Sequence, residues 1–304
     1  MLAAVHRWSC SKRLEEARLS VPALETVVSF TVVAPEGSAD SILQAMSRLV
    51  ASLDPVLDYR GRNGLGELNR AGRGVPEGDL RLLLVQAFML RDATGGAFEP
   101  CILPLVGLWG FHDEPRVPSS AEIDSARALC GPRCCRMAGD TLVLSPGSGI
   151  DLGAVAAGFA ADRAFDLAME SGAVAALVDA GGEIRCGGDR EWRIAIRHPR
   201  EDGFWDVLEV SDCGVSTSGD YESFVMSDGA RFCHILDPST GMPESGVASV
   251  TVVAGNCTVA DGLSTALAVG GPDLLEIVPE SLWTGVLFVL ETDSGLVERR
   301  FGVL

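Results

Sequence analysis

Basic residues are scarce in this chain of 304 residues, and their scarcity limits the ligands that it can bind. The sequence has 24 lysine and arginine residues against 42 aspartate and glutamate residues, which gives a formal net charge of −18. It contains no run of basic residues and no alternation of basic with aromatic residues. Because nucleic-acid binding needs a basic surface, this composition argues against such a partner. A small anionic ligand would have to be held by a metal ion or by helix N-termini.

Long hydrophobic segments are also missing. No apolar run reaches the roughly 18 residues of a transmembrane candidate, and residues 1–21 contain no uninterrupted apolar segment of a signal peptide. The nine cysteines are scattered, and the one group, Cys130, Cys134 and Cys135, lacks the paired spacing of a zinc site. We therefore expect a cytoplasmic protein with reduced cysteines and no membrane insertion.

The pattern of apolar residues predicts one α+β domain. No linker, low-complexity tract or solenoid repeat interrupts the chain. We predict an N-terminal extension over residues 1–22, and over residues 23–304 a single two-lobed domain with mixed, largely antiparallel sheets flanked by helices. Periodicity and turn residues predict helices over 40–53, 80–91, 119–131, 154–171 and 258–269. They predict strands over 26–34, 174–179, 192–197, 207–210, 231–236 and 249–253, hairpins over 135–144 and 284–301, a loop over 59–69 and a turn over 216–220.

His234 is the first candidate for chemistry, since the chain has only four histidines. It lies where a predicted strand runs into the turn Asp237-Pro238-Ser239-Thr240-Gly241. Histidine has the side-chain pKa closest to neutrality, so this position suits acid–base work. The alternative is a structural histidine satisfied by a neighbour at a sheet edge.

A second candidate is the pair Asp261 and Thr265, which share one face of a predicted helix by their i, i+4 spacing. Oxygen ligands of this kind suit Mg²⁺. The alternative is a capping box of Thr258 with Asp261.

The helix that follows Asp151-Leu152-Gly153 begins with small residues, which suit either the close approach of a ligand to the backbone or tight helix packing. On the same helix, the spacing of Asp162, Asp166 and Glu170 predicts a solvated face.

Several motifs together resemble the ApbE family of FAD:protein FMN transferases. The match runs over about residues 24 to 270. The motifs are Gly95-Gly96-Ala97-Phe98-Glu99-Pro100, Leu108-Trp109-Gly110-Phe111, Asp151-Leu152-Gly153-Ala154 through Ala164, Gly181-Gly182-Glu183-Ile184, Thr217-Ser218-Gly219, His234 through Gly241, and Ala260 through Leu267. Each motif alone is weak, and jointly they are specific.

The resemblance implies a Mg²⁺-dependent enzyme that moves the FMN half of FAD onto a threonine hydroxyl of an acceptor protein and releases AMP. It assigns the role of general base to His234, and Mg²⁺ binding to Asp261, Thr265 and the carbonyl group of Ala154. By motif match, it places FAD contacts on Tyr59, Ala97, Phe98, Glu99, Asp151, Ile235 and Ser264.

The departures from the family pattern concern FAD binding. Leu24-Glu25-Thr26 stands where the family has Met-Gly-Thr, and Ala157 stands where it has lysine. Glu99 replaces aspartate, and Asn63 and Gly66 stand in a loop where the family has serines. Two further hypotheses therefore stand beside transfer: a non-catalytic flavin-nucleotide-binding protein, and an FAD hydrolase that gives FMN and AMP.

Overall fold

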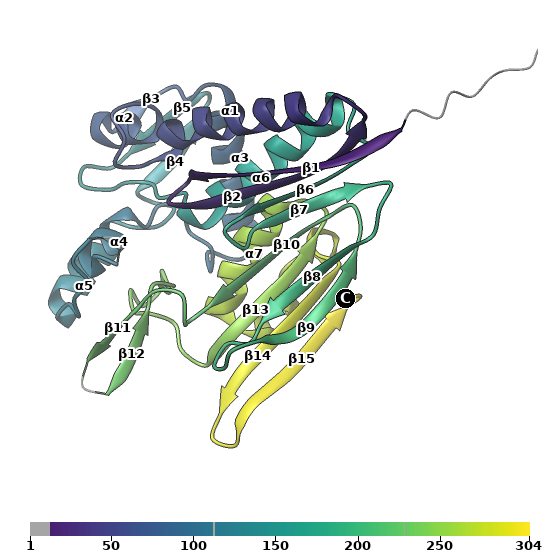
Figure 1. Ribbon diagram of the computed structural model, residues 1–304. Helices are drawn as coiled ribbons and strands as arrows, with labels where there is room; N and C mark the ends of the chain where they lie inside the picture. The colour runs from purple at the N-terminus through teal and green to yellow at the C-terminus, as the bar shows by residue number, and fades with distance from the viewer. Residues whose placement is uncertain (1–12, 112, 228) are drawn as a thin grey trace, which may run out of the picture.

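An eight-stranded antiparallel sheet runs through the computed structural model, which describes residues 13–111, 113–227 and 229–304 (Figure 1). The strand order is β1-β2-β6-β7-β10-β13-β14-β15, and every neighbouring pair is antiparallel. The strands are β1 (Leu14–Ala23), β2 (Thr26–Pro35), β6 (Ala175–Ala180), β7 (Ile184–Gly188), β10 (Cys213–Gly219), β13 (Val247–Ala254), β14 (Gly285–Thr292) and β15 (Gly295–Gly302). The predicted fold class, α+β with largely antiparallel sheets, is confirmed.

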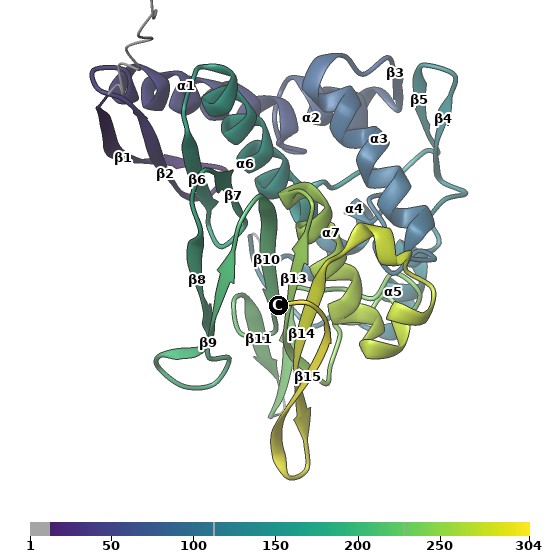
Figure 2. The ribbon, with the colours of Figure 1, turned by 90° about the vertical axis from the view of Figure 1, so that its right-hand side faces the viewer.

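Four helices lie on one side of this sheet, three of them against it and the fourth, residues 78–93, packed on the other helices (Figure 2). Val28, Phe30 and Val32 alternate along β2 toward this face, where they join Met46 and Phe165 of the helices in a buried cluster. A larger cluster joins the other helices to β13 and β14. The four helices are α1 (Ala39–Leu57), α3 (Gly78–Ala93), α6 (Gly153–Glu170) and α7 (Cys257–Gly270).

A β-ribbon packs on the opposite face of the sheet. It consists of β8 (Trp192–Arg197) and β9 (Phe204–Val210). Trp192, Ile194 and Ile196 alternate with exposed residues along β8 and contact the sheet beside Cys186. The central strands of the large sheet are thus covered on both faces, whereas the outer strands β1 and β15 stay largely exposed.

A second group of elements projects from this body and is held by a tryptophan (Figure 1). Trp109 is fully buried, stacks on Phe111 at 5.8 Å between ring centroids, and lies 5.7 Å from Phe232. Its Nε1–H donates to the Gly241 carbonyl oxygen at 2.9 Å. The group consists of α4 (Leu103–Trp109), α5 (Ser120–Arg127), β11 (Phe224–Ser227) and β12 (Ala230–Cys233).

The remaining elements are short. They are α2 (Gly64–Ala71), the three-stranded sheet of β3 (Arg73–Gly74), β5 (Thr141–Leu144) and β4 (Cys135–Ala138), and the 3₁₀ helices η1 (Pro272–Glu276) and η2 (Glu280–Leu282). No helix in the described ranges is both long enough and apolar enough to cross a bilayer.

Three local predictions are wrong. Residues 59–69 are not a loop throughout, because α2 begins at Gly64 and buries Leu65. The polar run 216–220 is not a turn, because most of it lies in β10, where the hydroxyl groups of Thr217 and Thr251 bond across strands at 2.8 Å. Strand β12 ends at Cys233 rather than at residue 236, so His234 lies just beyond it.

Candidate active site

Helices α6 and α7 cross closely because a glycine lies at their contact. A Cβ atom on Gly158 would stand 2.6 Å from the carbonyl oxygen of Cys257 and 2.8 Å from the Cβ of Asp261. The Gly158 N–H donates to Oδ2 of Asp261 at 3.0 Å. This crossing fixes the Asp261 carboxylate against the N-terminal half of α6.

The N-terminus of α7 is capped without help from Asp261. Asn256 caps the helix with its side chain. The Asp162 carboxylate accepts from the backbone N–H groups of Cys257 and Thr258, both at 2.8 Å. The capping-box alternative for Asp261 is therefore wrong, and so is the solvated position predicted for Asp162. Asp166 and Glu170, the other members of that predicted face, are exposed.

Burial makes the carboxyl group of Asp261 an unusually weak acid. Its side chain is 6% exposed, and this burial raises its pKa to about 7, with the negative charges of Asp162 and Glu222 adding to the effect. A carboxylate in these surroundings is stabilised by a cation.

Thr265 follows Asp261 by one helical turn. Its hydroxyl lies 3.5 Å from Oγ of Ser218, which lies 2.8 Å from Oγ of Ser264. Ser264 is fully buried and also donates to the Asp261 carbonyl oxygen at 2.9 Å. Hydroxyl groups from α7 and β10 thus pack behind the carboxylate.

His234 is oriented through the carbonyl oxygen of Ser223. Its backbone N–H donates to that oxygen at 2.9 Å, and its Nδ1 lies 3.2 Å from it. Because a carbonyl oxygen only accepts, Nδ1 carries the proton in this contact, and Nε2 is the basic nitrogen.

The turn after His234 is held by its own aspartate. The Asp237 carboxylate accepts from the Ser239 N–H at 2.8 Å, and from the hydroxyls of Ser239 and Thr240 at 2.9 and 3.0 Å. Gly241 adopts a φ of 73°, and an added Cβ would meet Ile123 at 2.7 Å. This rigid turn limits the positions that His234 can take.

One cavity, named here the His234 cavity, brings these side chains together. His234, Ala154, Asp261 and Thr265 all line it. Another part of its wall is apolar and contains Phe98, Ile102, Val106, Phe111 and Leu236. The other lining residues are Ala97, Glu99, Asp151, Gly153, Ala157, Glu183, Thr217, Ser218, Glu222, Ile235 and Pro238. The described residues of this wall include neither lysine nor arginine.

A family model described as "ApbE family" matches residues 24–286, which is most of the chain. The chain belongs to the ApbE family.

Curated relatives and solved structures agree with this assignment. An FAD:protein FMN transferase of Vibrio cholerae is 34% identical over 306 residues, covering 95% of this chain and 92% of the relative. One of Treponema pallidum is 34% identical, covering 87% and 83%. The structure of the ApbE protein of Thermotoga maritima matches with a TM-score of 0.85 at 32% identity, covering 94% of this chain and 97% of that one. That of the flavin transferase ApbE of Vibrio cholerae matches with a TM-score of 0.84 at 29% identity, covering 95% and 97%.

The residues predicted to contact FAD do not all lie in one place in this ApbE-family chain. Ala97, Phe98, Glu99, Asp151 and Ile235 line the His234 cavity. Ser264 lies behind its wall, and Tyr59 lines a neighbouring cavity. Burial raises the pKa of Glu99, whose Oε1 accepts from the Cys101 N–H at 2.8 Å.

Two acidic residues of the cavity were given no role by the sequence. Burial raises the pKa of Glu183 well above its ordinary value, and the charges of Asp261 and Glu222 add to this. Desolvation of its carboxyl group at the cavity also raises the pKa of Glu222, although the residue as a whole is exposed. The Gly181-Gly182 turn before Glu183 was a usable signal, whereas no pattern around Glu222 distinguished it from an ordinary surface glutamate.

The neighbouring cavity, named here the Arg60 cavity, lies along α6. Its lining includes Tyr59 and Arg60, and it shares Asp151, Gly153 and Ala157 with the His234 cavity. The remaining lining residues are Leu24, Glu25, Asp54, Leu57, Asp58 and Ala156. Burial, together with the negative charge of Asp151, raises the pKa of Tyr59 to about 12, so its hydroxyl stays protonated at neutral pH.

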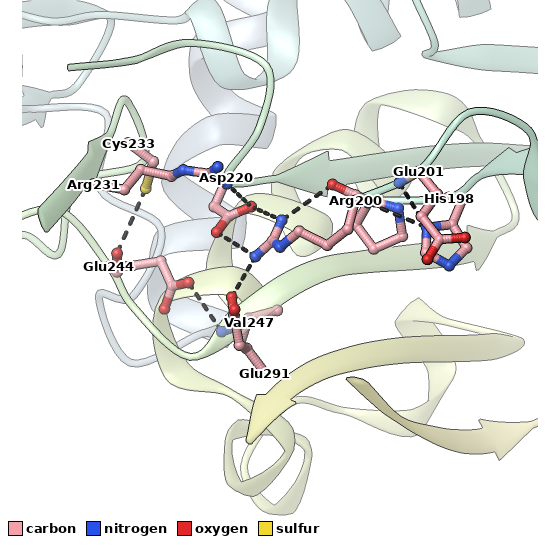
Figure 3. A network of polar contacts seen from close by, with 10 residues as sticks. His198, Arg200, Glu201, Asp220, Arg231, Cys233, Glu244, Val247 and Glu291 are labelled. Atoms are coloured by element: carbon pink, nitrogen blue, oxygen red, sulfur yellow. Dashed lines mark hydrogen bonds and ion pairs between the residues drawn. The ribbon is translucent and has the colours of Figure 1, made fainter. Parts of the chain in front are cut away.

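A charged network supports the segment between β10 and His234 (Figure 3). Arg200 makes two hydrogen bonds to Asp220, at 2.7 and 2.8 Å, and one to Glu291 at 2.5 Å. Arg231 of β12 reaches Asp220 at 3.5 Å. Asp220 thus links the β8–β9 loop to the β11–β12 ribbon, which is followed directly by His234.

Proposed function

We propose that this protein transfers the FMN moiety of FAD to a threonine hydroxyl of an acceptor protein, releases AMP, and requires Mg²⁺. The observation that carries the proposal is the convergence of Asp261, Thr265, Ala154 and His234 on one cavity in an ApbE-family chain. The names of the curated relatives support the same reaction.

The donor set at α7 fits a magnesium ion. The Asp261 carboxylate, the Thr265 hydroxyl and the Ala154 carbonyl group are hard oxygen ligands, which Mg²⁺ prefers. The raised pKa of Asp261 fits as well, because a cation would supply the charge compensation that this buried carboxylate needs. When bound, Mg²⁺ would neutralise charge on the pyrophosphate.

The acidity of the His234 cavity also favours a metal-dependent reaction. Glu99, Asp151, Glu183, Glu222 and Asp261 line it, and its described wall has no lysine or arginine to offset them. A pyrophosphate dianion would be repelled there unless a cation came with it. The apolar part of the wall offers a surface for a flat heteroaromatic ring.

His234 acts as the general base in this proposal. Nε2 accepts the proton of the threonine hydroxyl while its oxygen forms a bond to the phosphorus of the FMN phosphate. The bond from that phosphorus to the bridging oxygen breaks, and AMP leaves with the bond's electron pair. The Ser223 carbonyl oxygen holds Nδ1–H and stabilises the imidazolium that forms.

The test is to incubate the protein with FAD, Mg²⁺ and a threonine-bearing acceptor peptide, and to follow peptide mass and AMP by mass spectrometry. We expect equal amounts of FMN-labelled peptide and AMP. His234→Ala should lower the rate by at least 100-fold and still bind FAD. Asp261→Asn should abolish the Mg²⁺-dependent activity. Asp166→Asn, the same change at an exposed aspartate of α6, should leave that activity unchanged.

Other outcomes would decide against transfer. AMP without a labelled peptide would establish hydrolysis instead. FAD binding without AMP would establish a non-catalytic flavin-nucleotide-binding protein. Full transfer by His234→Ala would remove His234 from the role of base.

A further inference from the structure

The Arg60 cavity adjoins the His234 cavity and contains none of the residues given a catalytic or metal-binding role. Asp151, Gly153 and Ala157 line both cavities, so one elongated ligand can extend from one into the other. Two of these shared residues, Gly153 and Ala157, carry no side chain beyond Cβ, which leaves room for a ligand at the shared wall.

The two cavities differ in the basic residues that line them. Among the described residues that line either cavity, Arg60 is the only arginine, and no lysine is present. The only lysine of the sequence, Lys12, lies outside the described residues. Arg60 is therefore the one permanently charged cation among the described lining residues that an anionic ligand can meet along this path.

Arg60 is held by an acidic residue on a strained turn. Leu24 and Glu25 form the two-residue turn between β1 and β2, and their φ angles are 54° and 59°. This left-handed pair of positions favours asparagine and glycine, so leucine and glutamate are unfavourable there. Strain of this kind at the wall of a cavity is typical of a functional position.

The turn places the Glu25 carboxylate in an ion pair with the Arg60 guanidinium. Arg60 also lies over the ring of Tyr59, at 5.2 Å from its centroid, and 3.4 Å from Oδ1 of Asp58. The side chains of Arg60 and Glu25 are 38% and 60% exposed, so the pair is solvated and weak. A guanidinium in a weak pair can exchange its carboxylate for a phosphate, to which it can donate two parallel hydrogen bonds.

We propose that Arg60 binds the AMP-side phosphate of the FAD pyrophosphate from the side of the Arg60 cavity, and that Glu25 holds the guanidinium at the cavity until FAD displaces it. This assignment rests on the proposed function, because FAD is the phosphate-bearing ligand. Arg60 is a specificity-determining residue in this account. It discriminates FAD from flavins without phosphate, such as riboflavin.

The experiment measures the dissociation constants of FAD and riboflavin by flavin fluorescence, with Mg²⁺ present, at several salt concentrations. Arg60→Ala should weaken FAD binding at least tenfold, flatten its salt dependence and leave riboflavin binding unchanged. Glu25→Gln should tighten FAD binding, because it releases the guanidinium and removes a negative charge. Arg62→Ala, at an exposed arginine that lines neither cavity, is the matched control and should behave as the wild type.

A rescue variant separates charge from packing. Ala157→Lys in the Arg60→Ala background places a cation at the wall that the two cavities share, and it should restore much of the FAD affinity and its salt dependence. Circular dichroism checks that each variant is folded.

Equal FAD affinity in the wild type and Arg60→Ala would overturn the assignment. If the wild type binds FAD but releases no AMP, the proposed transfer fails, whereas the role of Arg60 is still decided by the dissociation constants. If the wild type does not bind FAD, both proposals are overturned.

Discussion

Some single residues near the cavities are held in conformations or surroundings that lower the stability of the fold. Leu24 and Glu25 are held in left-handed conformations at the wall of the Arg60 cavity. Glu244 loses much of its hydration beside the network that supports His234 (Figure 3). Each of these costs can be measured by a substitution.

Glu25→Gly should stabilise the fold by about 1 kcal/mol. Left-handed strain costs on the order of 1–3 kcal/mol for a residue with a side chain, and the flexibility of glycine offsets part of that gain by about 0.5–1 kcal/mol. Denaturant unfolding measures the difference. The comparison is Asp212→Gly, at a φ of 48°, which also removes a hydrogen bond from the Gly188 N–H and should gain less. A destabilised Glu25→Gly protein would show that the ion pair with Arg60 matters more than the strain.

Glu244 should make stability depend on pH. Burial raises its folded-state pKa to about 7, above the unfolded value of about 4.3. Its contribution is therefore fully present below the unfolded pKa and is lost as pH rises through 7. Glu244→Gln, whose amide oxygen can still accept from Val247, should gain stability over the wild type progressively from pH 4.5 to 8. A difference in unfolding free energy that does not change with pH would contradict this.

At the scale of elements, the crossing of α6 and α7 is the contact on which the proposed metal site depends. Asp261 reaches α6 because Gly158 has no side chain. Both helices also pack into the same buried cluster, so neither can move freely to accommodate added volume.

Gly158→Ala should destabilise the protein by about 1–3 kcal/mol, the usual cost of overpacking, and should abolish Mg²⁺-dependent activity. The control is Gly107→Ala in α4, where an added Cβ meets nothing within 4 Å and should be neutral or slightly stabilising. Denaturant unfolding measures the change in stability, and initial rates measure the change in activity. Unchanged activity in a folded Gly158→Ala protein would show that the helices separate without disturbing Asp261.

Periodic elements could be predicted from the sequence, and elements made by tertiary contacts could not. The alternation in β2 and the apolar stripe of α1 depend on which face is buried, and the sequence contains that information. Helix α2 consists of glycine-rich sequence that packs only because Leu65 is buried by distant residues. Strand β10 is polar, and its hydroxyl groups are satisfied by partners on other elements.

The same limit applies to the site. The spacing of Asp261 and Thr265 indicated a shared face, and the histidine turn was visible as a run of turn residues. Glu183 and Glu222 become part of the site only when three separate segments meet at α7. The ion pair of Arg60 with Glu25 joins positions far enough apart in the sequence that no local pattern could indicate it.

At the scale of the whole molecule, a net charge of −18 makes cation binding a source of stability. We expect Mg²⁺ together with FAD to raise the melting temperature by several degrees, since a ligand at 100 times its dissociation constant adds about 2.7 kcal/mol. Asp261→Asn should remove the Mg²⁺-dependent part of this shift. An equal shift in that variant, measured by calorimetry, would place the cation elsewhere.

The lack of a lysine or arginine in the described wall of the His234 cavity has a kinetic consequence. Under the proposed function, a cavity with several carboxylates and no such cation would repel free FAD and attract Mg²⁺. Mg²⁺ would then enter before FAD or together with it, and FAD would not enter first. Turnover would follow the concentration of the Mg²⁺–FAD complex, and excess uncomplexed FAD would compete poorly for the site.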